Sequence, residues 1–308
     1  MARYVIKRVV AGLFSIFVLT TITFFLMHAV PGGPFSPAEQ RDVPQEVLEQ
    51  IEAKYGLDKP VYEQYLLYMG GLLHGDFGNS FKKADTSVNE LIGSGFPVSA
   101  EVGGLAILLA MIVGIPLGIL SATHRGKFID KFSMTFATVG ISVPSFVLSV
   151  LLMFLFAVKL RILPTYGLET WQSFILPVFC LAFSPIAYIT RLMRSSMLEV
   201  MRQDYIRTAR SKGVSEFFVI AKHALRNSII PIVTYLGPLV AALLTGSFVI
   251  ERLFSIPGIG RYFVSGISDR DYSVTLGLTI FFGALLILCN IIVDLFYVII
   301  DPRVKIED

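Results

Sequence analysis

Asp204-Tyr-Ile-Arg-Thr-Ala-Arg-Ser-Lys-Gly213 is a charged, helix-forming stretch between two long apolar runs, and it is followed by His223-Ala-Leu-Arg-Asn227. The surrounding residues 191–228 carry eight Lys and Arg against three Asp and Glu. Gly213 tolerates the left-handed backbone that ends a helix, and Ser215 can cap the next helix through its hydroxyl. The segment therefore predicts a helix, a glycine turn and a second helix on the cytoplasmic side of a membrane, where short basic loops remain.

Apolar residues in this segment recur at the spacing of one helix face. Met193 and Met197 are four residues apart, and Tyr205 and Ala209 repeat that interval. Side chains at i and i+4 lie on the same face of a helix. We therefore expect this face to pack inward while the Lys and Arg side chains stay in water.

The composition of the chain indicates a membrane protein. Hydrophobic residues make up 54% of it, charged residues 16%, and its mean hydropathy is +0.70. A helix needs roughly 20 apolar residues to cross a hydrocarbon core. Six stretches reach that length: 9–30, 102–123, 132–158, 171–190, 229–250 and 274–300. The first exceeds the apolar core of a signal peptide, so we expect it to be retained. The sequence predicts an all-α, polytopic protein with six transmembrane helices.

Lys and Arg are distributed unevenly between the loops. With the N-terminus inside, the cytoplasmic pieces hold 16, and the opposite side holds 5 once the long segment 31–98 is set aside. Long segments are largely exempt from the rule that basic loops stay inside. We therefore expect both termini in the cytoplasm. The chain then divides into a tail with the first span (1–30), an extracytoplasmic segment (31–98), a five-helix domain (99–300) that includes the loop 191–228, and a tail (301–308).

The sequence lacks the motifs of a nucleotide-binding or catalytic site. Gly126-Lys127 is followed by Phe128 and has no upstream glycine of a phosphate-binding loop. The histidines lack the i, i+4 spacing of a helical metal site, and the cysteines lie inside predicted spans as small core residues: His28, His74, His124, His223, Cys180 and Cys289. We therefore expect no catalytic residue, metal, bound cofactor or nucleic acid, and any ATP must be hydrolysed by another subunit.

Two features inside the predicted spans are candidates for a translocation path. Pro144, next to Ser145, would kink the third span and free carbonyl groups that must face protein or a water-filled path. Asp294 is an acid well inside the last span, where an ionisable group is costly unless it is paired or hydrated. A role in the path and a structural pairing near the cytoplasmic end both remain open for Asp294.

The charged loop resembles the cytoplasmic loop of bacterial ABC-importer permeases, whose general pattern is Glu-Ala-Ala, three residues and then Gly. Arg207, Thr208 and Ala209 stand at the first three positions, and Gly213 stands at the glycine. The leading Glu is absent, and residues 223–226 replace a later Ile-x-Leu-Pro. These departures match the oligopeptide, dipeptide and nickel branch of the binding-protein-dependent transport permeases.

Further matches follow in order from residue 31 to residue 303. They look like the first permease subunit of oligopeptide importers: Pro31-Gly-Gly-Pro-Phe35, Tyr55-Gly-Leu-Asp-Lys-Pro60, Gly75-Asp-Phe-Gly78, Phe96-Pro-Val-Ser99, Ile141-Ser-Val-Pro-Ser-Phe146, Pro257-Gly-Ile-Gly260 with Arg270-Asp-Tyr272, and Ile300-Asp-Pro-Arg303. The resemblance implies the type I ABC importer permease fold, with residues 99–300 as its transmembrane domain.

The same resemblance implies that the chain forms half of a pore that moves oligopeptides across the bacterial cytoplasmic membrane. Its implied partners are a second, paralogous permease, two cytoplasmic ATPases that bind ATP and Mg, an extracytoplasmic solute-binding protein, membrane lipid and the peptide. The residues implied to couple it to the ATPases are Asp204, Tyr205, Arg207, Thr208, Ala209, Gly213 and His223. A dipeptide or nickel importer of the same family remains open, as do a secondary transporter and a membrane scaffold.

Ser87→Cys and Ser211→Cys, each in a chain whose two native cysteines are replaced, should label from opposite sides of the membrane. The reason is the ratio of 16 to 5 Lys and Arg between the two sides. In intact cells, an impermeant maleimide should modify position 87 and should reach position 211 only after the membrane is broken. Labelling of both positions in intact cells would contradict the expected topology.

Overall fold

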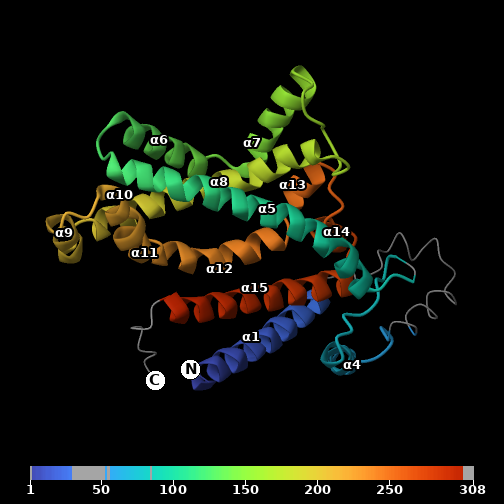
Figure 1. The fold of residues 1–308 in the computed structure, drawn as a ribbon. Helices are drawn as coiled ribbons and strands as arrows, with labels where there is room; N and C mark the ends of the chain where they lie inside the picture. The colour runs from blue at the N-terminus through green and yellow to red at the C-terminus, as the bar shows by residue number, and fades with distance from the viewer. Residues whose placement is uncertain (1, 30–52, 54–55, 84, 301–308) are drawn as a thin grey trace. The chain divides into compact units, whose positions relative to one another are not determined.

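The computed structural model describes residues 2–29, 53, 56–83 and 85–300, and Figure 1 shows that its regular elements are helices. The long helices are α1 (Ala2–Ala29), α5 (Val88–Thr123), α8 (Trp171–Val200) and α15 (Tyr272–Ile300). The shorter helices are α4 (Val61–Leu73), α6 (Phe128–Ser142), α7 (Ser145–Leu152), α9 (Asp204–Ser211), α10 (Glu216–Phe218), α11 (Leu225–Ser228), α12 (Ile230–Leu244), α13 (Phe248–Leu253) and α14 (Ile259–Ser268), with π-helical turns η1 (Met153–Lys159) and η2 (Val219–Ala224).

The all-α fold class expected from the sequence is confirmed. Within the described residues, strand pairing is limited to one isolated antiparallel bridge between Asn79 and Ser87. The motif at residues 31–35 and the tail expected at residues 301–308 lie outside the described part of the chain.

Five helical segments are long and apolar enough to cross a membrane: Ile6–Ala29, Val88–Thr123, Trp171–Val200, Ile230–Leu253 and Tyr272–Val293. A bent pair of helices, α6 with α7 and η1, makes six if it is counted as one span. Two helices extend well beyond the predicted apolar stretches: α5 begins at Val88, before residue 102, and α8 continues to Val200, past residue 190. Hydropathy finds only the apolar part of a helix, and both helices continue past it with mixed polar and apolar faces.

The predicted kink at Pro144 is a break in the helix. The axes on either side of it differ by 103°. Val143 has an extended backbone, with φ −85° and ψ 119°, because proline disfavours the helical conformation of the residue before it. Pro144 then stands just before the first turn of α7, where its missing N–H costs no hydrogen bond.

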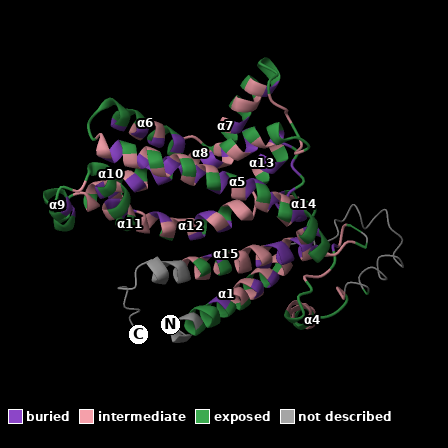
Figure 2. Cartoon of the chain, in the orientation of Figure 1, coloured by how far each residue is buried: buried purple, intermediate pink, exposed green. Residues whose placement is uncertain are grey.

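The chain forms two compact units, Met1–Val98 with Pro257–Ile287, and Ser99–Ile256 with Leu288–Asp308. In the second unit, α8 is buried along much of its length, as Figure 2 shows. Glycines let its neighbours approach: a Cβ at Gly118 of α5 would lie 2.5 Å from the Met193 Cβ of α8. At Gly140 of α6, a Cβ would lie 2.5 Å from that of Ala187. Small residues thus allow close packing of α5 and α6 on α8.

A buried ion pair joins α5, α6 and α8 near the turn between α5 and α6. Arg194 of α8 donates to both carboxylate oxygens of Asp130, at 2.6 and 2.9 Å. Ser121 Oγ of α5 donates to the same carboxylate at 2.6 Å, and the Gly126 N–H of the turn donates at 2.8 Å. The side chains of Asp130 and Arg194 are only 6% and 24% exposed. Four donors therefore satisfy one buried carboxylate.

A second buried carboxylate organises the other unit. Asp271, which is 3% exposed, accepts hydrogen bonds from Ser80 Oγ at 2.5 Å and from the Phe81 N–H at 3.1 Å. It also accepts from the Val274 N–H at 3.3 Å, in the first turn of α15. A negative charge is favourable at a helix N-terminus. This contact gives a structural reason for the sequence motif Arg270-Asp-Tyr272.

Replacing Arg194 should destabilise the chain far more than replacing its exposed neighbour Arg191 on the same helix. Arg194→Leu removes the partner of a buried carboxylate and should lower the free energy of unfolding by about 3–5 kcal/mol. Arg191→Leu should change it by about 0.5 kcal/mol or less. Thermal and denaturant unfolding of the purified chains in detergent measures both values. Equal losses from the two variants would contradict the role assigned to the ion pair.

Candidate coupling site

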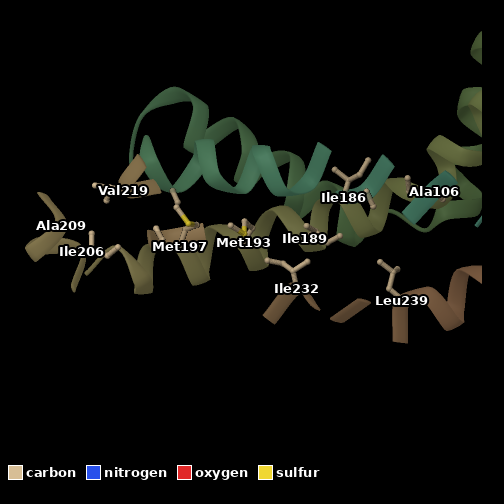
Figure 3. Close-up of a cluster of buried hydrophobic side chains, with 14 residues drawn as sticks. Ala106, Ile186, Ile189, Met193, Met197, Ile206, Ala209, Val219, Ile232 and Leu239 are labelled. Carbon is tan, nitrogen blue, oxygen red and sulfur yellow. The ribbon is translucent and has the colours of Figure 1, made fainter. Parts of the chain in front are cut away.

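Two apolar side chains, Ile206 and Ala209, anchor the helix α9 in the core of the second unit. Ile206 is fully buried and Ala209 is 7% exposed, and both belong to the cluster that contains Met197 of α8 and Val219 of η2 (Figure 3). The expectation that Tyr205 packs with Ala209 was wrong, because Tyr205 is 41% exposed. The inward face of α9 is formed by Ile206 and Ala209, at i and i+3 rather than at i and i+4, and it leaves Tyr205 partly exposed.

The C-terminus of α9 has the glycine turn expected from the sequence. Gly213 has φ +78°, a backbone conformation that favours glycine. The Val214 N–H donates to the Ala209 carbonyl at 3.3 Å, and the Gly213 N–H donates to that of Arg210 at 2.9 Å. These two bonds form a Schellman cap, and Val214 packs against the same apolar cluster as Ala209.

The turn after Gly213 is closed by an ion pair rather than by the expected hydroxyl cap. Ser215 precedes α10 but makes no capping hydrogen bond with its side chain. Instead, Arg210 donates to both carboxylate oxygens of Glu216, at 2.6 and 3.1 Å. These hydrogen bonds hold the pKa of Glu216 below its ordinary value. Both side chains are partly exposed, so the pair orients the turn more than it stabilises the fold.

Two of the sequence motifs meet across this site. Asn227 of α11 donates through Nδ2 to the Tyr205 hydroxyl at 2.7 Å. The hydroxyl of Ser228, the next residue, donates to the Ala224 carbonyl at 2.9 Å and lies 2.9 Å from Met197 Sδ. The Asp204–Gly213 stretch and the His223–Asn227 stretch are therefore parts of one folded element.

The remaining predicted residues form the outer surface of this element. The side chains of Asp204 and Arg207 are 97% and 75% exposed and lie 3.8 Å apart. Thr208 is exposed beside them and donates to the Asp204 carbonyl at 3.0 Å. His223 is half-buried in η2, which packs against α9. The result is a charged surface on a buried, apolar base.

The other candidate residues lie apart from this surface. Pro144 and Ser145 are at the bend between α6 and α7. Asp294 lies in α15, and its side chain is outside the described part of the structure. Among the described residues, no group of three or more His, Cys, Asp or Glu could hold a metal ion.

The sequence reasoning missed a buried acid near the end of the apolar segment Ile230–Leu253. Glu251 of α13 is 4% exposed and accepts a hydrogen bond from Ser99 Oγ of α5 at 2.7 Å. It lies after a break at Gly246, which has φ +80°. The sequence analysis singled out Asp294 as the acid inside a span, whereas Glu251 lies just past the end of the predicted span 229–250. Gly246 could have indicated the helix break that precedes Glu251, because a glycine inside an apolar run can mark a helix end as well as a packing site.

Apolar helices that carry an exposed, glycine-capped charged helix between them have the architecture of a multi-pass membrane protein. Two solved structures share the fold: the MetNI methionine ABC transporter in inward-facing conformations (TM-score 0.57, 16% identity) and an amino acid ABC transporter with histidines (TM-score 0.52, 17% identity). The matches cover 68% of this chain in both cases, and 96% and 94% of those chains. The fold is therefore that of type I ABC importer permeases.

The chain belongs to the family described as binding-protein-dependent transport system inner membrane component, which matches residues 114–306, and the N-terminal component of that description matches residues 1–105. It is 49% identical to the dipeptide transport system permease protein DppB of Bacillus subtilis (strain 168), over 100% of this chain and 99% of that protein. It is 46% and 44% identical to the oligopeptide transport system permease proteins OppB of Haemophilus influenzae and Salmonella typhimurium, over 99% of this chain and 100% of each relative.

The family membership decides between the classes that the sequence left open. The chain is the permease subunit of an ABC importer and a multi-pass inner membrane protein, not an enzyme. ATP hydrolysis belongs to separate subunits of such importers. The secondary transporter and the scaffold are therefore excluded.

Gly213→Val should loosen the end of α9, whereas Gly213→Asn should have a smaller effect. A Cβ at this position would meet no atom within 4 Å, so the cost comes from the positive φ alone. For a branched residue this cost is on the order of 1 kcal/mol or more, and asparagine adopts this conformation more readily. Hydrogen exchange of the α9 amides in the purified chain should be faster in the valine variant. Equal exchange in both variants would contradict the assigned cap.

Proposed function

We propose that this permease moves oligopeptides inward, with both termini in the cytoplasm and the surface of α9 docked on a cytoplasmic ATPase. The geometry of α9 carries the proposal: its outer face is charged and exposed, while Ile206 and Ala209 anchor it to the core. The assignment of oligopeptides as the substrate rests on relatives that are named for oligopeptide transport and are 43–46% identical over nearly the whole chain. Dipeptides are the second candidate, because a relative at 49% identity is named for dipeptide transport.

The proposed assembly contains a second, paralogous permease, two ATPases that bind ATP and Mg, and an extracytoplasmic solute-binding protein. Asp204, Arg207 and Thr208 would meet a cleft of the ATPase, and Gly213 and His223 would support them. Ile206 shares a buried cluster with Met197 of α8, so a displacement of α9 would be transmitted to α8. We further propose residues 99–300 as the transmembrane domain and residues 31–98 as the surface facing the binding protein. Pro144, Ser145 and Asp294 are proposed for the path or its bends.

ATP binding would close the two ATPases and draw the docked α9 surfaces together. Because Ile206 and Ala209 anchor α9 in the buried cluster with α8, this movement would reach α8. A flexible loop would instead absorb the displacement. The closure would convert the pore from inward-facing to outward-facing. ATP hydrolysis would then allow the return.

Ala209→Asp should abolish peptide uptake and the ATPase activity that the loaded binding protein stimulates. Ala209 is 7% exposed in an apolar cluster, and an unpaired charge there is costly to bury. Arg207→Ala should be milder, because an exposed ion pair is worth about 0–1 kcal/mol. The measurement is uptake into proteoliposomes that contain both permeases, the ATPases and the binding protein, with equal amounts of inserted permease.

The same proteoliposomes compare substrates. A labelled oligopeptide should accumulate only with ATP, and uptake should stop when the ATPases lose their catalytic glutamate. Preferential uptake of dipeptides or nickel would move the assignment within the family. Wild-type uptake by Ala209→Asp at equal insertion would remove α9 from the coupling role.

A further inference from the structure

A cavity of about 250 Å³ lies in the unit formed by residues 1–98 and 257–287. Its wall comes from the end of α1, from α4, from the loop before α5 and from the start of α15. Aromatic rings form much of the wall: Phe24, Tyr68, Phe81 and Tyr272. Polar side chains complete it: His28, Gln64, Asp76, Asn79 and Ser273. An apolar cavity with a few convergent polar groups is the usual form of a small-ligand site.

The charge of this cavity selects for a cation. Asp76 is the one Asp, Glu, Lys or Arg among the described residues that line it. Its Oδ1 accepts the Gly78 N–H at 2.9 Å, and a carboxylate has further lone pairs that accept hydrogen bonds. The faces of aromatic rings attract ammonium groups. The hydroxyls of Tyr68 and Tyr272 are buried in the wall and have no hydrogen-bond partner within the described structure. The wall therefore offers negative charge, aromatic faces and unused hydrogen-bonding capacity.

The surfaces next to the cavity are apolar and exposed. Leu67 lines the cavity and is 57% exposed, and its neighbour Leu66 on α4 is 64% exposed. On α1, Phe25 and Leu26 are 45% and 62% exposed. The Phe25 and Tyr65 rings lie 5.4 Å apart, so α1 and α4 meet here. This surface lies at the C-terminal end of the apolar segment Ile6–Ala29, opposite its basic N-terminus. The end of a span is expected to meet the lipid headgroups. Contact of these apolar side chains with lipid acyl chains is more favourable in free energy than contact with water.

We propose that this cavity binds the primary ammonium headgroup of a zwitterionic aminophospholipid, phosphatidylethanolamine, whose acyl chains lie along α1 and α4. The ammonium donates to Asp76 and lies against the aromatic wall. A phosphatidylglycerol headgroup carries the same phosphate but no ammonium to offset that charge beside the carboxylate, so it binds more weakly. The site does not depend on which substrate the permease transports.

Native mass spectrometry of the purified full chain, titrated with lipids of identical acyl chains, tests the proposal. Phosphatidylethanolamine should bind about tenfold more tightly than phosphatidylglycerol, the difference expected of one contact to a charged group. Phosphatidylcholine, which has no N–H donor, should bind more weakly than phosphatidylethanolamine. These comparisons use the unaltered protein, so they remain decisive if a variant fails to fold.

Asp76→Asn should remove most of the preference for phosphatidylethanolamine while leaving the binding of phosphatidylglycerol unchanged or stronger. Asparagine keeps an oxygen that can accept the Gly78 N–H, so the loop geometry is preserved. Asp58→Asn is the matched control, because it makes the same charge change at an exposed position outside the cavity wall. It should leave the preference intact.

Three results would overturn the proposal. The first is equal affinity of the unaltered chain for phosphatidylethanolamine and phosphatidylglycerol. The second is an undiminished preference in Asp76→Asn. The third is binding of a short apolar peptide that depends on its free N-terminal amine and on Asp76, with no preference among the lipids, which would assign the cavity to a peptide ammonium instead.

Discussion

The carboxylate of Asp130 is the contact on which the arrangement of α5, α6 and α8 depends. It accepts from Ser121 of α5, from the Gly126 N–H of the turn and twice from Arg194 of α8. Hydrophobic packing alone specifies poorly how helices are placed along one another in a membrane, because lipid tails are as apolar as the side chains. A bidentate ion pair has a fixed geometry, and it therefore sets the register of these helices.

This register has a consequence for α9. On α8, Met197 lies three residues after Arg194 of the ion pair. The Met197 side chain belongs to the same buried cluster as Ile206 of α9. The place where α8 shares a buried cluster with α9 is thus about one helical turn from the ion pair. Because close-packed interiors transmit displacements, a force applied to α9 reaches α8 rather than being lost in the loop.

Local signals in the sequence were sufficient for the elements of this region. The apolar runs predicted the spans, Pro144 predicted the bend, and Gly213 predicted the turn. Each depends on a property of one residue or one segment: length, a missing N–H or a tolerated positive φ. Local signals could not decide which of the neighbouring residues Tyr205 and Ile206 faces the core, because both are apolar enough to be buried.

Contacts between distant residues could not be predicted in the same way. The partners Asp130 and Arg194 are 64 positions apart, and Ser99 and Glu251 are 152 positions apart. The sequence analysis counted Arg194 among the basic residues of the segment 191–228 and gave no role to Asp130. Glu251 stood just past the end of a predicted span. Only the packing of α5 against its partners reveals that these carboxylates are buried and hydrogen-bonded.

The buried carboxylates Asp130 and Glu251 lie in parts of the second unit that differ in how continuous their helices are. Asp130 is held by four donors at a tight turn, whereas the Ser99–Glu251 bond lies beside the break at Gly246. The bend at Pro144 is a second break, with no i to i−4 bond to the proline nitrogen across it. Helices change direction most easily where their own hydrogen-bond ladder is interrupted. We therefore expect motion driven through α9 and α8 to leave the Asp130 contact intact and to appear as changes of angle at Pro144 and Gly246.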